Sequence, residues 1–269
     1  MKRASKLFVA LVAVVCLSVA LCGCSSSDYK PEKKQQTVAD SMLVKSGTLT
    51  VGVNANNAPY SAQSSGSIVG IDVDVAAAVA DELGLDLELV DVGSDPESAI
   101  SGGTVDMVMG VSSAGSSYSV TSSYRTSGAA VFAADSSAAL PTKKKSKIAA
   151  QASSLSAWEV SDRYGKKSLV ETNDLAEAFT DVSNGTTQYA ASDSTIGAYV
   201  AHTSGVTVYP ICLLEKATSY GIGISTTKSE LQTSVDTALE GLVDGGMVKV
   251  INSRWVGDAA DISSLKVVD

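Results

Sequence analysis

The sequence has little of what metal chemistry requires, because it contains one histidine, His202, and four cysteines. No group of His, Cys and acidic residues shows the ligand spacing of a zinc or iron site. We therefore expect no metal and no other cofactor. Three of the cysteines lie at the N-terminus, which leaves Cys212 alone and excludes a disulfide framework. The apolar neighbours of Cys212 predict a small buried side chain rather than a reactive thiol.

Positive charge is also scarce. The chain has 20 Lys and Arg against 29 Asp and Glu, a net charge of −9. This balance disfavours nucleic acid and anionic membrane surfaces as partners. The one basic cluster, Lys143 to Lys147, is interpreted as a solvated connector, and no repeat occurs at a solenoid period.

The N-terminus has the order of a secretory signal, with basic residues, then an apolar run over 7–20, then Leu-Cys-Gly-Cys. The run is too short for a comfortable membrane span. The last four residues resemble a bacterial lipobox, so we expect a lipoprotein signal peptide over 1–23 and lipidation of Cys24. A plain signal peptide and an uncleaved anchor are the alternatives. Residues 24–42 begin with a polar stretch that predicts a flexible tether.

From Thr48 onward the sequence alternates strands and helices, which favours an α/β fold. Strand patterns occur over 48–54, 86–92 and 105–111. Between the first two, residues 70–85 predict a helix with one apolar face, closed by Gly84. Asp95 and Pro96 begin a short helix. Strands separated by helices in this way indicate βαβ units and mostly parallel sheets.

The pattern restarts in the second half of the chain. Strands are expected over 147–153 and 168–171, and Asn173 or Asp174 is expected to cap the helix that follows them. The alternation breaks near Ala134 and near Lys216. We therefore expect two lobes joined by two hinge crossings, with 43–134 plus 217–269 in lobe 1 and 135–216 in lobe 2.

The strand at Val105 to Val111 runs into a loop of serine and glycine, "SSAGSSYSV", with no charge between Asp106 and Arg125. Open α/β sheets hold ligands at such polar loops beyond the carboxyl ends of strands. An ordinary surface loop would have the same composition. This loop is therefore a candidate pocket wall.

Several stretches carry a family resemblance. "GTLTVGVNANNAPYSA" followed by "GSIVGIDVDVAAAVADELGLDLELV" resembles the opening of the extracytoplasmic solute-binding proteins of polar amino-acid ABC transporters, family 3. The segments "SGGTVDMVMG", "ASDSTIGAYV" and "YGIGISTTKSELQTSVDTALEGLVDGGMVKVINSRWVGD" are similar to later parts of that family. The resemblance extends from Gly47 to Gly257. It implies a type II periplasmic-binding-protein fold that closes on a small solute and presents it to a membrane permease.

The resemblance also implies a ligand pocket. The family's contact positions fall on eight residues here: Asn54, Asn57, Gly110, Val111, Ser113, Ser153, Ser154 and Asp193. Tyr60, three places after Asn57, falls on a position that is usually core and is a further candidate. Asp193 matches the acid that pairs with the ligand's α-ammonium, and Ser153 and Ser154 match hydroxyl residues that grip its carboxylate at a helix N-terminus. Each has a simpler alternative, because Asp193 and the serines are also good helix caps and the asparagines good turn residues.

One departure from the family matters for the ligand. The family follows the loop serine with "TPER" or similar, whose arginine clamps the ligand carboxylate. Here Ser117 or Tyr118 occupies that place, and Arg125 lies several residues on. A charge-assisted contact of this kind contributes about 1.5 to 3 kcal/mol. Either Arg125 substitutes for the missing clamp, or the ligand has no α-carboxylate. A surface or inter-lobe ion pair is the simpler role for Arg125.

The expected function is therefore that of a monomeric receptor, anchored by lipid to the outer face of a bacterial cell membrane. It would deliver a small polar, amine-bearing solute such as an amino acid to an ABC permease. Two alternatives remain. The first is an enzyme on this scaffold, because relatives of these receptors include dehydratases of cyclic amino-acid precursors, although no pair of acids or histidine is arranged for acid–base chemistry. The second is a sensory lipoprotein that feeds no permease.

Overall fold

The computed structural model describes residues 34–258 and 261–268. The predicted signal peptide over 1–23 and the predicted lipidation site, Cys24, lie outside these residues. Among the described helices, none is long and apolar enough to cross a membrane.

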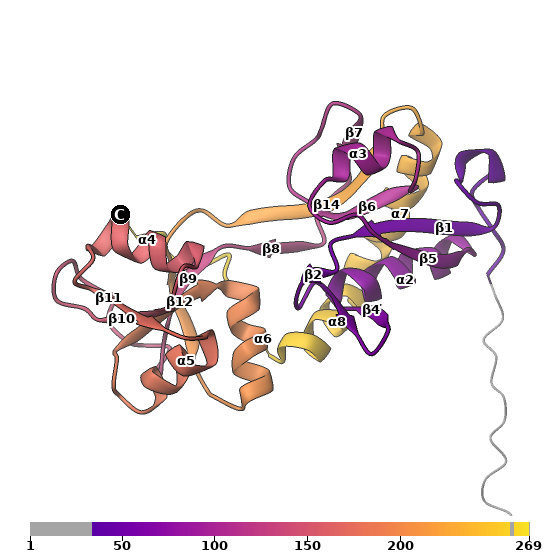
Figure 1. Ribbon diagram of the computed structural model, residues 1–269. Helices are drawn as coiled ribbons and strands as arrows, with labels where there is room; N and C mark the ends of the chain where they lie inside the picture. The colour runs from indigo at the N-terminus through magenta and orange to yellow at the C-terminus, as the bar shows by residue number, and fades with distance from the viewer. Residues whose placement is uncertain (1–33, 259–260, 269) are drawn as a thin grey trace, which may run out of the picture. The chain divides into compact units, whose positions relative to one another are not determined.

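The first lobe is built on a six-stranded sheet in the order β5-β1-β6-β14-β7, with β8 paired to β14 (Figure 1). Its strands are β1 (Thr48–Val53), β5 (Asp86–Asp91), β6 (Met107–Val111), β7 (Tyr118–Val120), β8 (Arg125–Ser127) and β14 (Thr218–Ser225). Strand β1 pairs in parallel with β5 and β6, whereas β14 runs antiparallel to β6, β7 and β8. The three strands predicted in this part of the chain are confirmed.

The helices of the first lobe are α2 (Ile71–Leu83), α3 (Pro96–Ser101), α7 (Ser229–Asp244) and α8 (Met247–Val256). Helix α2 ends at Gly84, whose φ of 70° lies in the left-handed region that favours glycine. Asp95 caps α3 by accepting a hydrogen bond from the Ser98 backbone N–H. Both predicted helix boundaries are confirmed.

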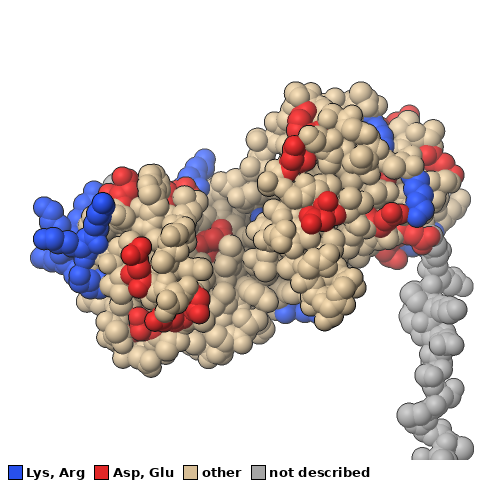
Figure 2. Space-filling model, viewed as in Figure 1, with Lys and Arg blue, Asp and Glu red and all other residues tan. Residues whose placement is uncertain are grey.

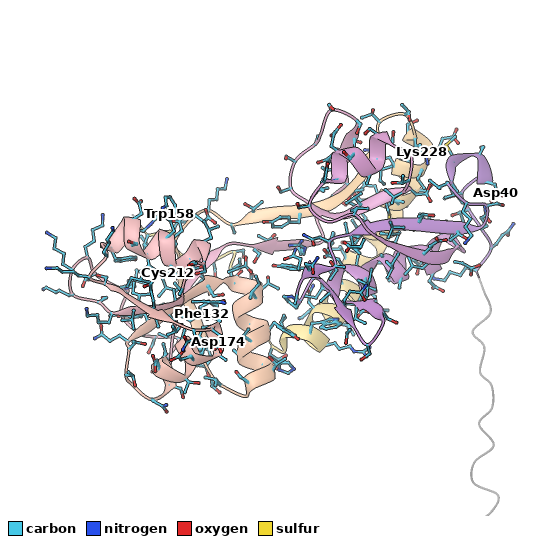
Figure 3. The ribbon with its side chains drawn as sticks, viewed as in Figure 1. Asp40, Phe132, Trp158, Asp174, Cys212 and Lys228 are labelled. Atoms are coloured by element: carbon cyan, nitrogen blue, oxygen red, sulfur yellow. The ribbon has the colours of Figure 1, made fainter. Side chains whose placement is uncertain are left out.

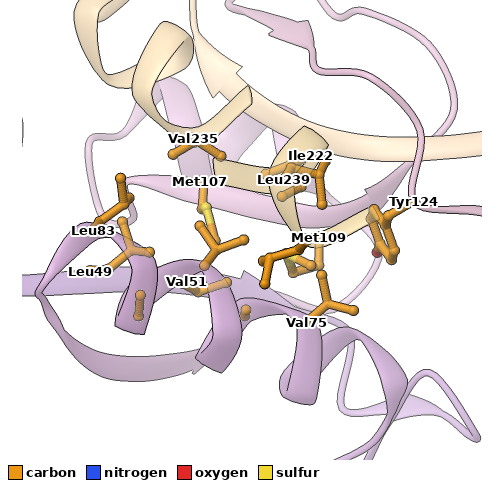
Figure 4. Packing of buried hydrophobic residues seen from close by; sticks show 14 of the residues in the cluster. Leu49, Val51, Val75, Leu83, Met107, Met109, Tyr124, Ile222, Val235 and Leu239 are labelled. Atoms are coloured by element: carbon orange, nitrogen blue, oxygen red, sulfur yellow. The ribbon is translucent and has the colours of Figure 1, made fainter. Parts of the chain in front are cut away.

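The first lobe's core forms where the apolar faces of α2 and α7 meet the sheet. Val75 and Leu83 of α2 lie with Val235 and Leu239 of α7 around Met107 of β6, and all are nearly fully buried (Figure 4). Complete burial of such a side chain contributes about 1.5 to 3 kcal/mol relative to exposure. This packing holds α2 against β6, and these two elements carry Asp72 and Gly110.

The second lobe has a five-stranded sheet in the order β11-β10-β12-β9-β13. Its elements are β9 (Ala129–Ala133), β10 (Ile148–Gln151), α4 (Leu155–Tyr164), β11 (Leu169–Thr172), α5 (Leu175–Ser183), β12 (Tyr189–Asp193), α6 (Ser194–Ser204) and β13 (Tyr209–Leu213). Strand β10 is parallel to β11 and β12, and β9 is antiparallel to β12 and β13. Asp174 is the cap of α5, which settles the choice left open with Asn173.

The second lobe is packed from both sides of its sheet. Phe132 of β9 contacts Phe179 of α5, with ring centroids 5.1 Å apart, and Phe132 is labelled in the second lobe in Figure 3. Cys212 is fully buried there, and burial raises the pKa of its thiol to about 11. The predicted burial of Cys212 is confirmed, and its low reactivity stays a prediction.

A small sheet was not predicted. Strands β2 (Asn56–Asn57), β3 (Ser61–Ser64) and β4 (Ser67–Val69) form an antiparallel meander between β1 and α2. Tyr60 lies at its first turn, and the Tyr60 backbone N–H donates to the Asn57 carbonyl at 2.8 Å. The meander therefore fixes the position of Tyr60.

The chain crosses between the lobes, and ends, at places that differ from the expected lobe boundaries. Strand β9 pairs with β12, so the first crossing lies at Gly128, before the boundary expected at 134. The end of the chain was expected in lobe 1, but Ile262 and Val268 pack into the second lobe's cores and Val267 bridges to Leu213 of β13. Burial of Ile262 and Val268 and pairing with the edge strand β13 favour this placement. Helical periodicity in the sequence reveals neither the burial nor the pairing.

The predicted tether is too long at its C-terminal end. Residues 34–42 pack on the first lobe, where Val38 is buried and the Thr37 backbone N–H donates to the Leu83 carbonyl at 3.1 Å. A short 3-10 helix, η1 (Asp40–Met42), follows. The polar composition of this stretch concealed Val38 and Met42, the apolar side chains that pack against the first lobe's core.

Candidate functional site

Helix α2 brings a buried carboxylate to the edge of the first sheet. Asp72 lies in the first turn of α2 and is 4% exposed. Its Oδ1 accepts hydrogen bonds from the Tyr124 hydroxyl at 2.7 Å and from Arg125 Nε at 3.2 Å. Burial, with the Asp72 charge adding to it, raises the pKa of Tyr124 well above its usual range, so the phenol remains a donor.

Arg125 forms the centre of the site. Its guanidinium carbon lies 3.8 Å from the centroid of the Tyr60 ring and 4.2 Å from that of the Tyr220 ring. Each cation–π contact contributes about 0.5 to 2 kcal/mol. Burial by itself would lower the pKa of Arg125, but Asp72 and the neighbouring tyrosines raise it above its usual value. The guanidinium is therefore charged and held in one orientation.

Gly110 makes room for this ion pair. Its φ of +71° is left-handed, and a Cβ built there would lie 2.6 Å from Arg125 Nη2 and 2.9 Å from Asp72 Oδ2. Both distances are shorter than any ordinary contact of a Cβ. The absence of a side chain at the end of β6 is what allows the arginine to reach the carboxylate.

Asp193 ends β12 and caps α6. Its Oδ1 accepts from the backbone N–H groups of Thr195 and Ile196, each at 3.0 Å. Its Oδ2 accepts from the Ser127 hydroxyl at 2.6 Å. The capping role left open by the sequence is therefore present.

Tyr60 links the two charged groups. Its ring stacks on Arg125, and its hydroxyl donates to Asp193 Oδ1 at 3.3 Å. Burial and the Asp193 charge raise the pKa of Tyr60 to about 12. The structure thus brings together four of the predicted residues: Tyr60, Gly110, Arg125 and Asp193.

The other predicted residues of the first lobe lie apart from this cluster. Asn54 accepts from the Asn56 backbone N–H at 3.1 Å, which makes it a turn residue, and Asn57 pairs within the meander. Val111 and Tyr118 are buried together in a separate apolar cluster, and Ser113 is exposed. Tyr118 packs in a core, so it does not stand in for the missing arginine.

The serines of the second lobe are at the start of α4. Ser154 is its N-cap and accepts from the Ala157 backbone N–H at 3.1 Å. Ser153 is exposed with a φ of 61°. Their position beyond the carboxyl end of β10 agrees with the predicted location, and no contact joins them to Arg125 or Asp193 in the described part of the chain.

A cavity of about 900 Å³ lies beside α6, bounded by α8, the stretch 205–210 and residues 257–258 and 261–263. Among the predicted site residues, Arg125 alone lines it. His202 also lines it, on the side of α6 that faces Gly257. Over residues 34–258 and 261–268, no three His, Cys, Asp or Glu side chains gather in a way that could hold a metal ion.

Sequence reasoning missed Asp72, Tyr124, Tyr220 and Ser127. For Asp72 a signal existed, because it shares the helical face of Val75 and Val79, three and seven positions on. A carboxylate on a buried apolar stripe requires a partner. Tyr124 and Ser127 are close to Arg125 in sequence, but their partners Asp72 and Asp193 are far away, and Tyr220 comes from β14. No local pattern connects these residues.

Three of the clustered residues lie at or beyond the carboxyl ends of strands that pair in parallel: Tyr60 after β1, Gly110 next to the last residue of β6, and Asp193 at the end of β12. In open α/β sheets this edge holds ligands. Two α/β lobes joined by crossing strands, with such an edge on each lobe, define a solute receptor with the type II periplasmic-binding-protein fold. The model of the bacterial extracellular solute-binding proteins, family 3, matches residues 49–258. The chain belongs to this family.

Solved structures agree with this fold. An ancestral cationic amino acid solute-binding protein is 26% identical with a TM-score of 0.64, and the match covers 79% of this chain and 97% of that chain. The L-cystine solute receptor of Neisseria gonorrhoeae in its unliganded open conformation is 21% identical, with a TM-score of 0.66 and coverage of 81% and 96%. A polar amino acid ABC uptake transporter substrate-binding protein from Streptococcus thermophilus is 22% identical, with a TM-score of 0.67 and coverage of 82% and 90%. A comparison with curated protein sequences found no match.

Proposed function

We propose that the chain binds a small amine-bearing solute, with an α-amino acid as the simplest case, between Arg125 and Asp193. The observation that carries the proposal is Tyr60, whose ring stacks on Arg125 and whose hydroxyl reaches Asp193. One phenol thus has a cation at its face and an anion at its tip. An α-amino acid carries the complementary pair of charges a short distance apart.

Arg125 takes the part of the missing clamp in this proposal. A guanidinium has five N–H donors in a planar fork, and Asp72 accepts the one on Nε. Asp72 and Tyr124 cannot use all of the others, so donors remain for a carboxylate. The stack between Tyr60 and Tyr220 holds the fork before the ligand arrives, which lowers the entropy lost on binding.

Asp193 supplies the anionic end. A carboxylate offers about four acceptor positions. Its Oδ1 accepts three donors and its Oδ2 accepts only the Ser127 hydroxyl among the described contacts. Oδ2 therefore has capacity for one further donor, and an ammonium N–H would satisfy it.

Calorimetry tests the proposal with a panel of amino acids, polyamines and small acids. For an amino acid that binds, its decarboxylated amine serves as the matched ligand. Arg125→Gln should weaken the amino acid roughly ten- to a hundredfold, the equivalent of about 1.5 to 3 kcal/mol, and leave the amine nearly unchanged. Thermal unfolding of the variant checks that its fold persists. Tight binding of a dicarboxylate alone, or equal loss for both ligands, would refute this assignment.

The proposal also covers the ligand class, the membrane anchor and the transport partner of the protein. The 26% identical structure is described as a cationic amino acid solute-binding protein, which supports an amino acid as the ligand class. We further propose that Cys24 carries lipid at the outer face of the membrane and that the loaded monomer delivers its solute to an ABC permease. Substitution of Cys24 by Ser, followed by cell fractionation, should release the protein from membranes.

We propose binding without turnover. The one histidine, His202, is in the last turn of α6 and lies against Gly257. Among the described residues it has no contact with Tyr60, Arg125 or Asp193. A general acid or base must reach the reacting atom directly or through one water. Incubation with a prephenate-like compound, followed by absorbance, should show no product, and steady product formation would favour the dehydratase alternative.

A further inference from the structure

Two loops of the second lobe bring six lysines together. Lys143, Lys144, Lys145 and Lys147 lie in the connector before β10, and Lys166 and Lys167 lie between α4 and β11. Lys147 Nζ donates to the Lys167 carbonyl at 2.6 Å, which joins the two loops. All six side chains are exposed. We call this group the lysine patch, and blue atoms gather at that end of the lobe in Figure 2.

The lysine patch carries uncompensated charge. Six of the chain's 20 Lys and Arg are in it, and none of the six forms an ion pair in the part of the chain that the structure describes. Elsewhere lysines do find acids, since Lys45 pairs with Glu88 and Lys228 with Asp106. A net negative protein therefore has one strongly positive surface.

The connector holds its lysines in a folded turn. Ser146 is buried, and its hydroxyl accepts from the Thr142 backbone N–H at 2.9 Å. The Lys145 backbone N–H donates to the Thr142 carbonyl at 3.3 Å. This geometry keeps the adjacent lysines outward, so their charges add at one surface and do not spread along a free chain.

The lysine patch lies away from the ligand edge. Ile148 and Leu169 are the paired first residues of β10 and β11, and each follows a patch lysine within two positions. The patch is therefore at the amino ends of these parallel strands, whereas Ser154 and Asp193 follow carboxyl ends. A solute bound at the proposed site would not reach it.

We propose that the lysine patch holds the second lobe against an anionic phospholipid surface. Each lysine near such a surface strengthens binding about fivefold. Only acids more than about 8 Å from the lysine patch, the screening length at physiological salt, act weakly on it. The sequence-based expectation against anionic membranes came from net charge, which does not describe a local surface.

The composition of the lysine patch favours lipid over nucleic acid. Residues 142–147 and 165–168 contain no arginine and no aromatic residue. Single-stranded nucleic acid is held by stacking of its bases on aromatic rings. Arginine is preferred in nucleic-acid sites because its guanidinium binds a phosphate through two hydrogen bonds at once. Point charges on flexible stems suit a fluid surface of headgroups.

The test is co-sedimentation with vesicles of phosphatidylglycerol or of phosphatidylcholine. The protein begins at residue 34, because residues 34–268 contain every described strand, helix and core cluster and form one compact unit. The patch variant is Lys143→Gln, Lys144→Gln and Lys145→Gln together. The control variant makes the same change at Lys216, Lys249 and Lys266, which are also exposed. Both variants have the same net charge.

We expect the unaltered protein to prefer phosphatidylglycerol and to dissociate at high salt. The patch variant should bind these vesicles roughly a hundredfold more weakly and the control variant nearly as well as the unaltered protein. Circular dichroism verifies that all three are folded. Equal binding of the two variants, or no preference between the two lipids, would overturn the proposal. Tighter patch-dependent binding to polyglutamate or to DNA than to vesicles would also overturn it, by assigning the surface to an acidic protein or a nucleic acid.

Discussion

The space at Gly110 gives a quantitative prediction. Gly110→Ala places a methyl group in a backbone with a φ of +71°, against the Arg125–Asp72 ion pair. The left-handed conformation by itself costs a non-glycine residue about 1 to 2 kcal/mol. The methyl group must also displace Arg125 Nη2 from a distance of 2.6 Å, and the stacked tyrosines oppose that movement.

Losing the charged hydrogen bonds of that pair adds about 1.5 to 3 kcal/mol. Gly110→Ala should therefore lower the free energy of unfolding by about 2.5 to 5 kcal/mol in total. Gly103→Ala is the matched control, because its φ is +65° and a Cβ there meets no atom within 4 Å. The control should lose only the backbone cost, about 1 to 2 kcal/mol.

Urea unfolding followed by circular dichroism measures both losses by linear extrapolation. Calorimetry with a bound solute gives a second readout, because only Gly110→Ala displaces Arg125. If the two variants lose the same stability and bind equally well, then Gly110 is only a backbone requirement and the crowded ion pair is not part of the site.

Three further predictions concern single side chains. Asp193→Ala should lower the free energy of unfolding by about 2 to 4 kcal/mol, because the α6 cap and the partners of Tyr60 and Ser127 are lost together; Asp193→Asn, which can still cap, should lose less in the same urea assay, and equal losses would contradict the capping role. The Cys212 thiol, whose pKa burial raises to about 11, should not react with a thiol reagent at pH 8 until urea unfolds the protein, and fast labelling of the native protein would be inconsistent with this. The pKa of Tyr60 is about 12 in the folded protein against about 10 in the unfolded chain. The contribution of the neutral phenol to the free energy of unfolding is therefore fully present below pH 10 and is lost as the pH rises toward 12. Tyr60→Phe should make that loss shallower, and an unchanged pH profile of unfolding would show that another group causes it.

The sequence predicted the elements well where one short stretch contained the whole signal. Helix α2 has its apolar stripe and its closing Gly84 in fourteen successive residues, and α3 has Asp95 and Pro96 side by side. The meander from β2 to β4 has no such stripe, so it was missed. The C-terminal segment was misassigned because its apolar residues, Ile262 and Val268, are few and their partners are on β13 and neighbouring strands.

The candidate site divides in the same way. Tyr60, Gly110, Arg125 and Asp193 were each identified from local patterns or family resemblance, but their partners were not. Arg125 was left with two possible roles, as a clamp or a surface ion pair, because its charge is visible in the sequence and its neighbours are not. The lysine patch shows the same limit, since one of its loops was noticed and interpreted as solvated.

The amino-acid sequence by itself determined the α/β alternation, the helix caps and the family, because these depend on periodicity and on hydrogen bonds between near neighbours. Only the tertiary structure decided that Asp72, Tyr124 and Tyr220 surround Arg125, and that two lysine loops form one surface. The reason is that burial and Coulomb energy depend on distance in space. Strands β8 and β14 and helix α2 come together only when the sheet has formed.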